Sequence, residues 1–175
     1  VGSCSGAILT AFVARELREM GRPEVAARLV MIDPFAYCPW YFRFFLVPVF
    51  GPLMYATAFA NPVGRWITNL FLQDKRAGDT NLTESFAAVD HRVVWKYLKM
   101  LFECGRPGQF RGLHLPVDIL YGEKTFSAVR RSVQEWKEAL PQARVKELAG
   151  VGHLPISEGT EKVAEVVFVG GKVKK

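Results

Sequence analysis

The chain opens with VGSCSGA, residues 1–7, which places Cys4 between two serines and two glycines. The stretch that follows, Ala7 to Met20 (AILTAFVARELREM), repeats apolar residues at helical spacing and ends before Gly21, a residue that favours helix termini. A pentad of the form small-x-nucleophile-x-small before a helix is typical of a tight strand-to-helix turn. The pattern predicts that this turn raises the Cys4 thiol to one end of a sheet, as a candidate nucleophile.

The flanking glycines of the pentad indicate a crowded turn. We expect a larger side chain at Gly2 or Gly6 to collide with neighbouring backbone. A frame shifted by one residue would make Ser5 the nucleophile, which is a less natural assignment. At the amino end of a helix the dipole favours a thiolate, so the position suits Cys4 chemically. The alternative is an inert, buried thiol in a turn of similar shape.

The composition is that of one folded domain. The 175 residues are 50% hydrophobic and 23% charged, which allows a substantial core and argues against disorder. The net charge of +6 is spread along the chain. No basic motif interleaved with aromatic residues is present, so no nucleic-acid partner is expected. A basic tail adds to the charge, with Lys172, Lys174 and Lys175.

The cysteines predict neither a disulfide framework nor a metal site. They are odd in number and far apart, and no Cys or His spacing suits zinc. A reducing, cytoplasmic setting is therefore expected, with no metal and no cofactor. The three cysteines are Cys4, Cys38 and Cys104.

Apolar runs outside the pentad predict an α/β fold with a parallel sheet. Residues 28–32 (RLVMI) form a continuous apolar run that ends at Asp33, as a buried strand does. A strand, turn, helix and second strand form a βαβ unit. The second half repeats the pattern of strand, helix, strand, loop and helix, at residues 117–122, 127–140, 143–148, 150–153 and 161–169.

Residues 35–112 interrupt this pattern and are expected to form a helical cap. Ten aromatic residues lie between Phe35 and Phe59, and no charge occurs from Phe44 to Gly64. The run is long enough to span a bilayer, but its prolines argue against one straight helix. An amphipathic helix is expected within residues 83–102, with its buried side formed by Val89, Val93, Val94, Tyr97, Leu98 and Leu101.

With these segments in place, the chain resembles the α/β-hydrolase fold family, from the nucleophile elbow onward. Residues 1–7 look like that elbow, with Cys4 at the nucleophile position, and residues 148–155 (LAGVGHLP) look like the catalytic-histidine loop. The resemblance covers about residues 1–33 and 113–168. It implies a partial hydrolase core formed by residues 1–34 and 113–175, a cap at residues 35–112, and an N-terminal half of the fold outside this sequence.

The resemblance also implies a catalytic triad of Cys4, His153 and Asp33. The backbone N–H of Ser5 would be one oxyanion-hole donor. In the family the acid most often lies in a Gly-x-x-Asp pattern, where this chain has Thr125. Some haloalkane-dehalogenase-like members carry the acid at the position of Asp33, although an Asp there is also common without a catalytic role. A Cys–His pair can react without a strong acid.

Other titratable residues near these positions are expected to play lesser parts. Glu123 is close to the usual acid position but is expected to point away. His91 in the cap and His114 before a strand are expected to be structural or exposed. The sequence begins at Val1 within the motif and without Met, so we expect a preceding strand and a Gly-rich loop to supply the second oxyanion donor.

The function implied is acyl transfer on a hydrophobic ester, thioester or lactone, either to water or to another acceptor. Cysteine at the elbow is similar to dienelactone hydrolases and polyhydroxyalkanoate synthases, but no further motif ties the chain to either. The alternative is a catalytically silent hydrolase fold that acts as a binding or scaffold subunit. Its apolar segment at residues 35–72 would then contact a protein partner or a membrane surface, chiefly through residues 40–72.

Overall fold

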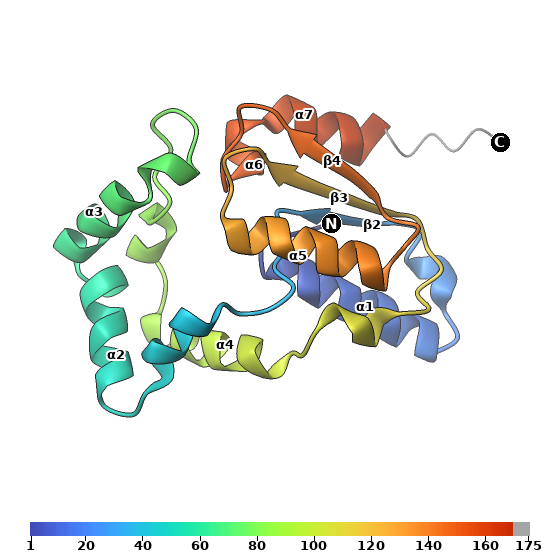
Figure 1. The fold of residues 1–175 in the computed structure, drawn as a ribbon. Coiled ribbons are helices and arrows are strands. Elements are labelled where there is room, and N and C mark those ends of the chain that lie inside the picture. The colour runs from blue at the N-terminus through green and yellow to red at the C-terminus, as the bar shows by residue number, and fades with distance from the viewer. Residues whose placement is uncertain (170–175) are drawn as a thin grey trace.

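The computed structural model describes residues 1–169, so the three basic tail residues lie outside the described part. Its centre is a parallel sheet of four strands in the order β1-β2-β3-β4 (Figure 1). Met31 of the second strand pairs with Gly2 on one side and with Ile119 on the other. The predicted parallel α/β sheet is confirmed. The strands are β1 (Gly2–Ser3), β2 (Leu29–Ile32), β3 (Val117–Gly122) and β4 (Arg144–Leu148).

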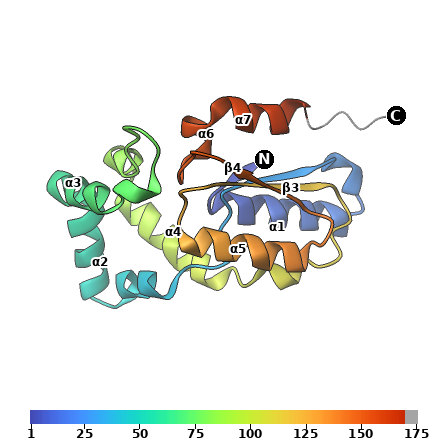
Figure 2. The ribbon, with the colours of Figure 1, turned by 45° about the horizontal axis from the view of Figure 1, so that its top comes forward.

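Helices cover both faces of the sheet (Figures 1 and 2). On one face lie α1 (Gly6–Glu19) and α5 (Ser127–Ala139), and on the other lie α6 (Pro155–Glu158), α7 (Thr160–Ala164) and the π-helical turn η7 (Glu165–Val169). Alternate strand residues point to opposite faces, so neighbouring side chains of β2 and β3 join two different apolar clusters. The last helix was predicted at residues 161–169, and α7 with η7 confirms it within one residue at its start. The short helix α6, which begins at Pro155 because proline fits the first helical position, was not predicted.

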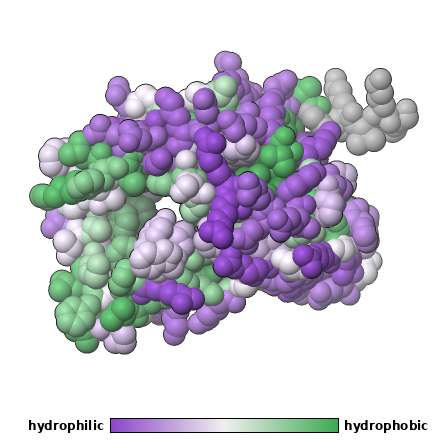
Figure 3. All heavy atoms as spheres, in the orientation of Figure 1, coloured by the Kyte–Doolittle hydropathy of each residue, from purple (hydrophilic) through white to green (hydrophobic). Residues whose placement is uncertain are grey.

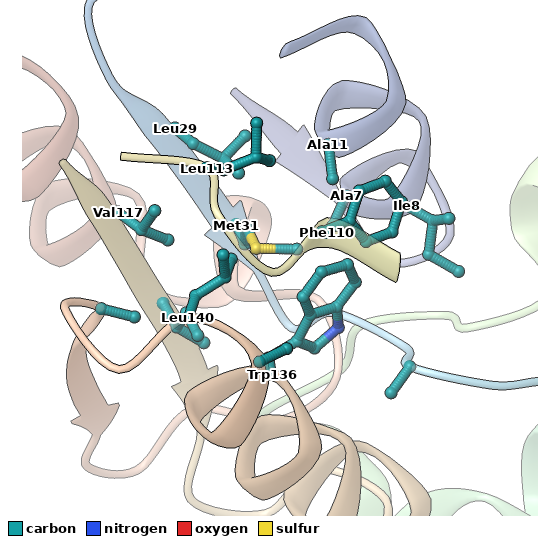
Figure 4. Close-up of a cluster of buried hydrophobic side chains, with 14 of the residues drawn as sticks. Ala7, Ile8, Ala11, Leu29, Met31, Phe110, Leu113, Val117, Trp136 and Leu140 are labelled. Atoms are coloured by element: carbon teal, nitrogen blue, oxygen red, sulfur yellow. The ribbon is translucent and has the colours of Figure 1, made fainter. Parts of the chain in front are cut away.

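The larger cluster lies between the sheet, α1 and α5 (Figure 4). Trp136 of α5 stacks on Phe110 with ring centroids 5.4 Å apart, and both side chains are fully buried. The Trp136 indole N–H donates to the Phe35 carbonyl over 3.1 Å, so the ring's polar atom is also satisfied. Phe35 and Phe110 lie just inside the predicted limits of the cap, residues 35–112, although both pack with the core cluster. The cap boundaries stay a prediction.

The segment between β2 and β3 is helical and lies beyond one end of the sheet (Figure 1). Pro48 and Pro62 lie at breaks between its short helices, as predicted, whereas Pro52 lies within the helix Phe50–Tyr55. Its elements are η2 (Trp40–Leu46), α2 (Phe50–Tyr55), η3 (Ala56–Ala60), α3 (Pro62–Phe71), η4 (Gln73–Lys75), η5 (Glu84–Ala87) and α4 (His91–Glu103), followed by η6 (Pro107–Phe110).

The predicted buried side of the last cap helix is correct only in part. Helix α4 turns Val94, Tyr97, Leu98 and Leu101 toward a cavity. Val89, by contrast, precedes the helix and is exposed, and Val93 is 60% exposed. The helix begins at His91, later than expected, because Asp90 caps it by accepting from the Arg92 N–H.

Within residues 1–169, no single helix has both the length and the apolar composition to cross a membrane. One bent pair, Trp40–Leu46 with Phe50–Ala60, meets the requirement jointly, but its two parts meet at 110°.

Candidate active site

The predicted turn at Cys4 is present between β1 and α1. Cys4 has a φ of 53°, a left-handed conformation that is uncommon for a residue with a side chain and that stores strain. Its N–H continues the sheet pairing by donating to the Ile32 carbonyl over 2.8 Å. The turn thus sets the thiol at the carboxyl end of the strands, next to the first turn of α1.

The two glycines of the pentad are not equivalent. A Cβ on Gly2 would lie 2.5 Å from the Gly6 carbonyl oxygen and 2.7 Å from Thr10 Oγ1, so no larger residue fits. At Gly6, in contrast, no described atom outside its own helix and neighbours would lie within 4 Å of a Cβ. The expected collision at Gly6 is therefore wrong, because this residue already belongs to the outward-facing first turn of the helix.

Alanine at these glycines should have opposite effects. We expect Gly2→Ala to lower the free energy of unfolding by about 1–3 kcal/mol, since its Cβ overlaps backbone that cannot move freely. Gly6→Ala should be neutral or stabilising by up to about 1 kcal/mol, because alanine favours a helix. Urea denaturation of the two variants beside the wild type measures both values. Equal losses would contradict the geometry of the turn.

Asp33 follows β2 at the same end of the sheet and is completely buried. Its Oδ1 accepts from the Gly122 N–H over 3.0 Å. Its Oδ2 accepts from the Thr125 hydroxyl and, over 2.5 Å, from His153 Nδ1–H. A buried carboxylate needs such donors to remain charged. Asp33 is thus held in place by two groups and oriented toward the histidine.

His153 lies in the loop after β4 and joins Asp33 to Cys4. Its Nε2 is 3.9 Å from Cys4 Sγ, while its backbone N–H donates to the Lys75 carbonyl over 2.8 Å. The ring lies edge-on between two aromatic rings, those of Phe35 and Phe126. Burial disfavours the charged ring, but hydrogen bonds to Asp33 and Cys4 outweigh it and raise the pKa of His153 to about 9.

Thr125 has a role that the sequence did not indicate. It occupies the position where the usual acid was expected, yet it is buried and donates its hydroxyl to Asp33. Its oxygen also lies 3.3 Å from His153 Nδ1. Thr125 therefore supports the carboxylate of Asp33 rather than replacing it. Glu123 instead accepts from the Gly150 N–H over 2.6 Å, which agrees with the expectation that it points away.

Glu158, which the sequence analysis did not single out, fastens the histidine loop to the cap. Its Oε2 accepts from the Gly152 N–H over 2.5 Å, and its Oε1 accepts from the Ala77 N–H over 3.0 Å. A Cβ on Gly152 would lie 2.6 Å from the Lys75 carbonyl oxygen, so the approach needs glycine. No local pattern marks Glu158, because its partner in the cap, Ala77, is 81 residues away in sequence.

The expected oxyanion donor, the Ser5 N–H, makes no hydrogen bond to any described residue. It follows the apex of the turn and so remains available to a substrate oxygen. The Ser5 hydroxyl accepts from the Tyr97 hydroxyl of α4 over 3.1 Å, which links the turn to the cap. The Ser5 N–H therefore remains a candidate oxyanion donor.

A cavity of about 220 Å³ lies between the turn and the cap. Cys4 and Ser5 form its floor, and its walls are almost entirely apolar. Aromatic side chains dominate the cap side, among them Phe42, Phe45, Tyr55, Phe59 and Phe86. Part of the aromatic residues of the predicted cap therefore surround a space that ends at the Cys4 thiol.

The other histidines and Cys38 do not take part in the contacts that join Cys4, His153 and Asp33. His91 Nδ1 is 3.2 Å from the Tyr55 hydroxyl, and His114 is exposed. Burial raises the pKa of Cys38 to about 12, which makes it a poor nucleophile. Across residues 1–169, no group of three or more His, Cys, Asp or Glu side chains could hold a metal ion.

A sequence profile described as the alpha/beta hydrolase family matches residues 1–166. The chain belongs to this family. No curated protein matches the chain in sequence. The resemblance on residues 1–7 and 148–155 is therefore confirmed for the family, whereas the profile leaves the cysteine nucleophile untested.

Several solved structures share the fold at low sequence identity. Rv0554 from Mycobacterium tuberculosis is 17% identical, with a TM-score of 0.63 over 96% of this chain and 62% of its own length. A thermophilic esterase from Thermogutta terrifontis is 16% identical, with a TM-score of 0.56 over 95% and 61%. The epoxide hydrolase CorEH is 14% identical, with a TM-score of 0.57 over 96% and 65%. This α/β hydrolase chain thus spans less than two thirds of each.

Proposed function

We propose that this α/β hydrolase transfers acyl groups through Cys4, with His153 as the acid–base and Asp33 as its partner. The observation that carries the proposal is the continuous contact from Cys4 Sγ to His153 Nε2 at 3.9 Å and from His153 Nδ1 to Asp33 at 2.5 Å. These contacts end at the floor of an apolar cavity. A nucleophile, a base and an orienting carboxylate in this order are the arrangement used for acyl transfer.

In the first half-reaction the Cys4 sulfur attacks the carbonyl carbon of the substrate. His153 keeps its proton at neutral pH, and the attacking form of the sulfur is the thiolate, which the neighbouring imidazolium stabilises. The carbonyl electrons move to oxygen, where the Ser5 N–H stabilises the negative charge. Collapse breaks the bond to the leaving group, which takes the proton from His153 Nε2. The products are a thioester on Cys4, a neutral His153 and the free alcohol or thiol.

In the second half-reaction neutral His153 removes a proton from water as the oxygen attacks the thioester. Collapse expels the Cys4 thiolate, releases the carboxylic acid and leaves the imidazolium as at the start. An alcohol or amine in place of water would give a new ester or amide by the same proton movements. Acyltransferase activity is thus a variant of the same site.

The cavity favours an aromatic or short acyl group as the part held against Cys4. A cavity of about 150 Å³ lined by apolar side chains is enough for benzene. The space above Cys4, about 220 Å³, is somewhat larger and similarly apolar. An ester, thioester or lactone with a small hydrophobic acyl group therefore fits this site best.

The alternative function is a hydrolase fold that binds a partner without catalysis. Large apolar side chains exposed on the cap favour it, because such surfaces often mark interaction sites. The two functions differ in the behaviour of Cys4. A catalytic Cys4 reacts faster than the other thiols and depends on His153, whereas a silent one does neither.

Thiol labelling tests this difference. We expect iodoacetamide at neutral pH to modify Cys4 well before Cys38 and Cys104, as measured by peptide mass spectrometry over time. The variant His153→Ala should slow the labelling of Cys4 by roughly 100-fold, because the imidazolium that supports the thiolate is lost. An activated ester of a small aromatic acid should leave an acyl adduct on Cys4.

His91→Ala is the matched control, since His91 lies in the cap region and contacts Tyr55 rather than Cys4. Its labelling rate should equal that of the wild type. Equal and slow labelling of all three cysteines in the wild type would contradict the enzymatic proposal and support the silent one.

A further inference from the structure

The most unusual surface of the molecule lies on helix α3. Its apolar residues Val63, Trp66, Ile67 and Leu70 recur at the spacing of a single helix face and are 41–67% exposed. None of the ten residues of the helix is buried. A helix at the surface of a water-soluble domain normally turns this stripe toward the core.

The polar side chains of α3 are directed to the protein instead. Thr68 Oγ1 donates to the Ala58 carbonyl over 3.3 Å, and Asn69 Oδ1 accepts from the Leu82 N–H over 3.0 Å. Arg65 donates to the Phe59 carbonyl over 3.2 Å. Helix α3 is therefore inverted, with its hydrogen-bonding side satisfied inside and its apolar side turned to the surroundings.

Neighbouring elements extend the apolar stripe into a larger patch, here called the cap face. Figure 3 shows hydrophobic side chains gathered over this end of the molecule, where Figure 1 places α2 and α3. The side chains that form the cap face are each 49–82% exposed. The cap face consists of Phe50, Leu53, Trp66, Leu70 and Phe71.

We propose that the cap face inserts into the surface of a lipid membrane. The charge pattern supports this occupant, because residues 34–73 contain Arg43 and Arg65 but no Asp or Glu. No carboxylate in this segment would have to approach anionic headgroups or lose its hydration. Trp66 lies in the face, and tryptophan favours the boundary between headgroups and acyl chains.

The bend of the cap argues for shallow insertion rather than a span. Trp40–Leu46 and Phe50–Ala60 together have the length and composition of a membrane segment, yet they meet at 110°. Helices that lie in the plane of the interface bury one apolar face and keep the rest of the protein in water. The other side of these elements lines the cavity above Cys4, through Phe42, Phe45 and Tyr55. The proposed membrane insertion of the cap face does not depend on whether Cys4 is catalytic.

Vesicle co-sedimentation of the full chain tests the proposal. Vesicles of mixed phosphatidylcholine and phosphatidylglycerol should carry the wild type into the pellet. The double variant Trp66→Glu with Phe71→Glu should lower the partition coefficient by about 100-fold or more, because two large apolar side chains are replaced by charge. Both side chains are more than 60% exposed, so the fold should survive, as circular dichroism checks.

The matched control is Val13→Glu with Met20→Glu, which replaces an exposed apolar residue of α1 and the exposed residue that follows the helix, 58% and 71% exposed. It should bind vesicles as the wild type does. Brominated lipid should quench the fluorescence of Trp66, measured as the difference between the wild type and Trp66→Phe.

Three results would overturn the proposal. The first is a wild type that stays in the supernatant, and the second is a folded Trp66→Glu, Phe71→Glu variant that binds as tightly as the wild type. The third is a dimer in analytical ultracentrifugation that this variant abolishes, without vesicle binding, since the occupant would then be a second copy of the chain.

Discussion

Replacing Asp33 by Asn is expected to lower kcat/KM for an activated ester by about 10³-fold with little change in fold. In a serine triad the equivalent change costs on the order of 10⁴-fold, and a thiol depends less on its base. The physical reason lies in the 2.5 Å contact between Asp33 Oδ2 and His153 Nδ1–H. An amide N–H at that position cannot accept this proton, and a neutral side chain no longer stabilises the imidazolium.

Asp118→Asn serves as the control for removing a buried carboxylate. Asp118 is 5% exposed and pairs with Arg28 and Arg144 on another part of the sheet, away from Cys4. That variant should lose stability but keep its kcat/KM per folded molecule. A folded Asp33→Asn variant with unchanged kcat/KM would show that His153 works without this carboxylate. Steady-state kinetics with a chromogenic ester of a small aromatic acid measures both variants.

The stability of the protein is expected to fall as the pH rises from about 6.5 to 9. The pKa of His153 is raised from 6.5 to about 9 in the folded state, so the folded protein holds a proton that the unfolded chain releases. The resulting stabilisation is complete below pH 6.5 and is lost as the pH passes through 9. The shift corresponds to about 3 kcal/mol in the free energy of unfolding.

Urea denaturation across this pH range measures the effect, and His153→Gln isolates it. The variant keeps His91 and His114, so the difference between the two pH profiles reports His153 alone. We expect the free energy of unfolding of His153→Gln to be nearly flat where that of the wild type falls. Parallel profiles would mean that the ring is neutral in the folded protein.

The arrangement of the chain could be predicted where the signals are local. The turn at Cys4 follows from glycines beside the nucleophile and a helix directly after it. Strands β2 and β3 were found within about one residue of their bounds because buried parallel strands are continuous apolar runs. Pro48 and Pro62 marked two of the breaks between the short helices of the cap. Each of these features is set by residues close together in the sequence.

The sequence predicted which residues belong to the candidate triad, but not how they contact one another. Asp33 was one of two substitutes for the missing acid, and nothing local separated it from an Asp that merely ends a strand. The contact with His153 joins residues 120 apart in sequence, and it depends on the register of β2, β3 and β4. Thr125 and Glu158 were not recognised as supports, because a hydroxyl or carboxylate acquires its role from a remote partner.

What the sequence determined by itself is thus the order of elements, the family and the nucleophile candidate, since these depend on periodicity and turn chemistry within short segments. Tertiary structure decided three other matters. It brought Asp33, Thr125 and His153 together, it left Gly6 free where Gly2 is confined, and it turned the apolar stripe of α3 outward. Periodicity shows that a helix has two unlike faces, but only packing against the rest of the chain decides which face meets the surroundings.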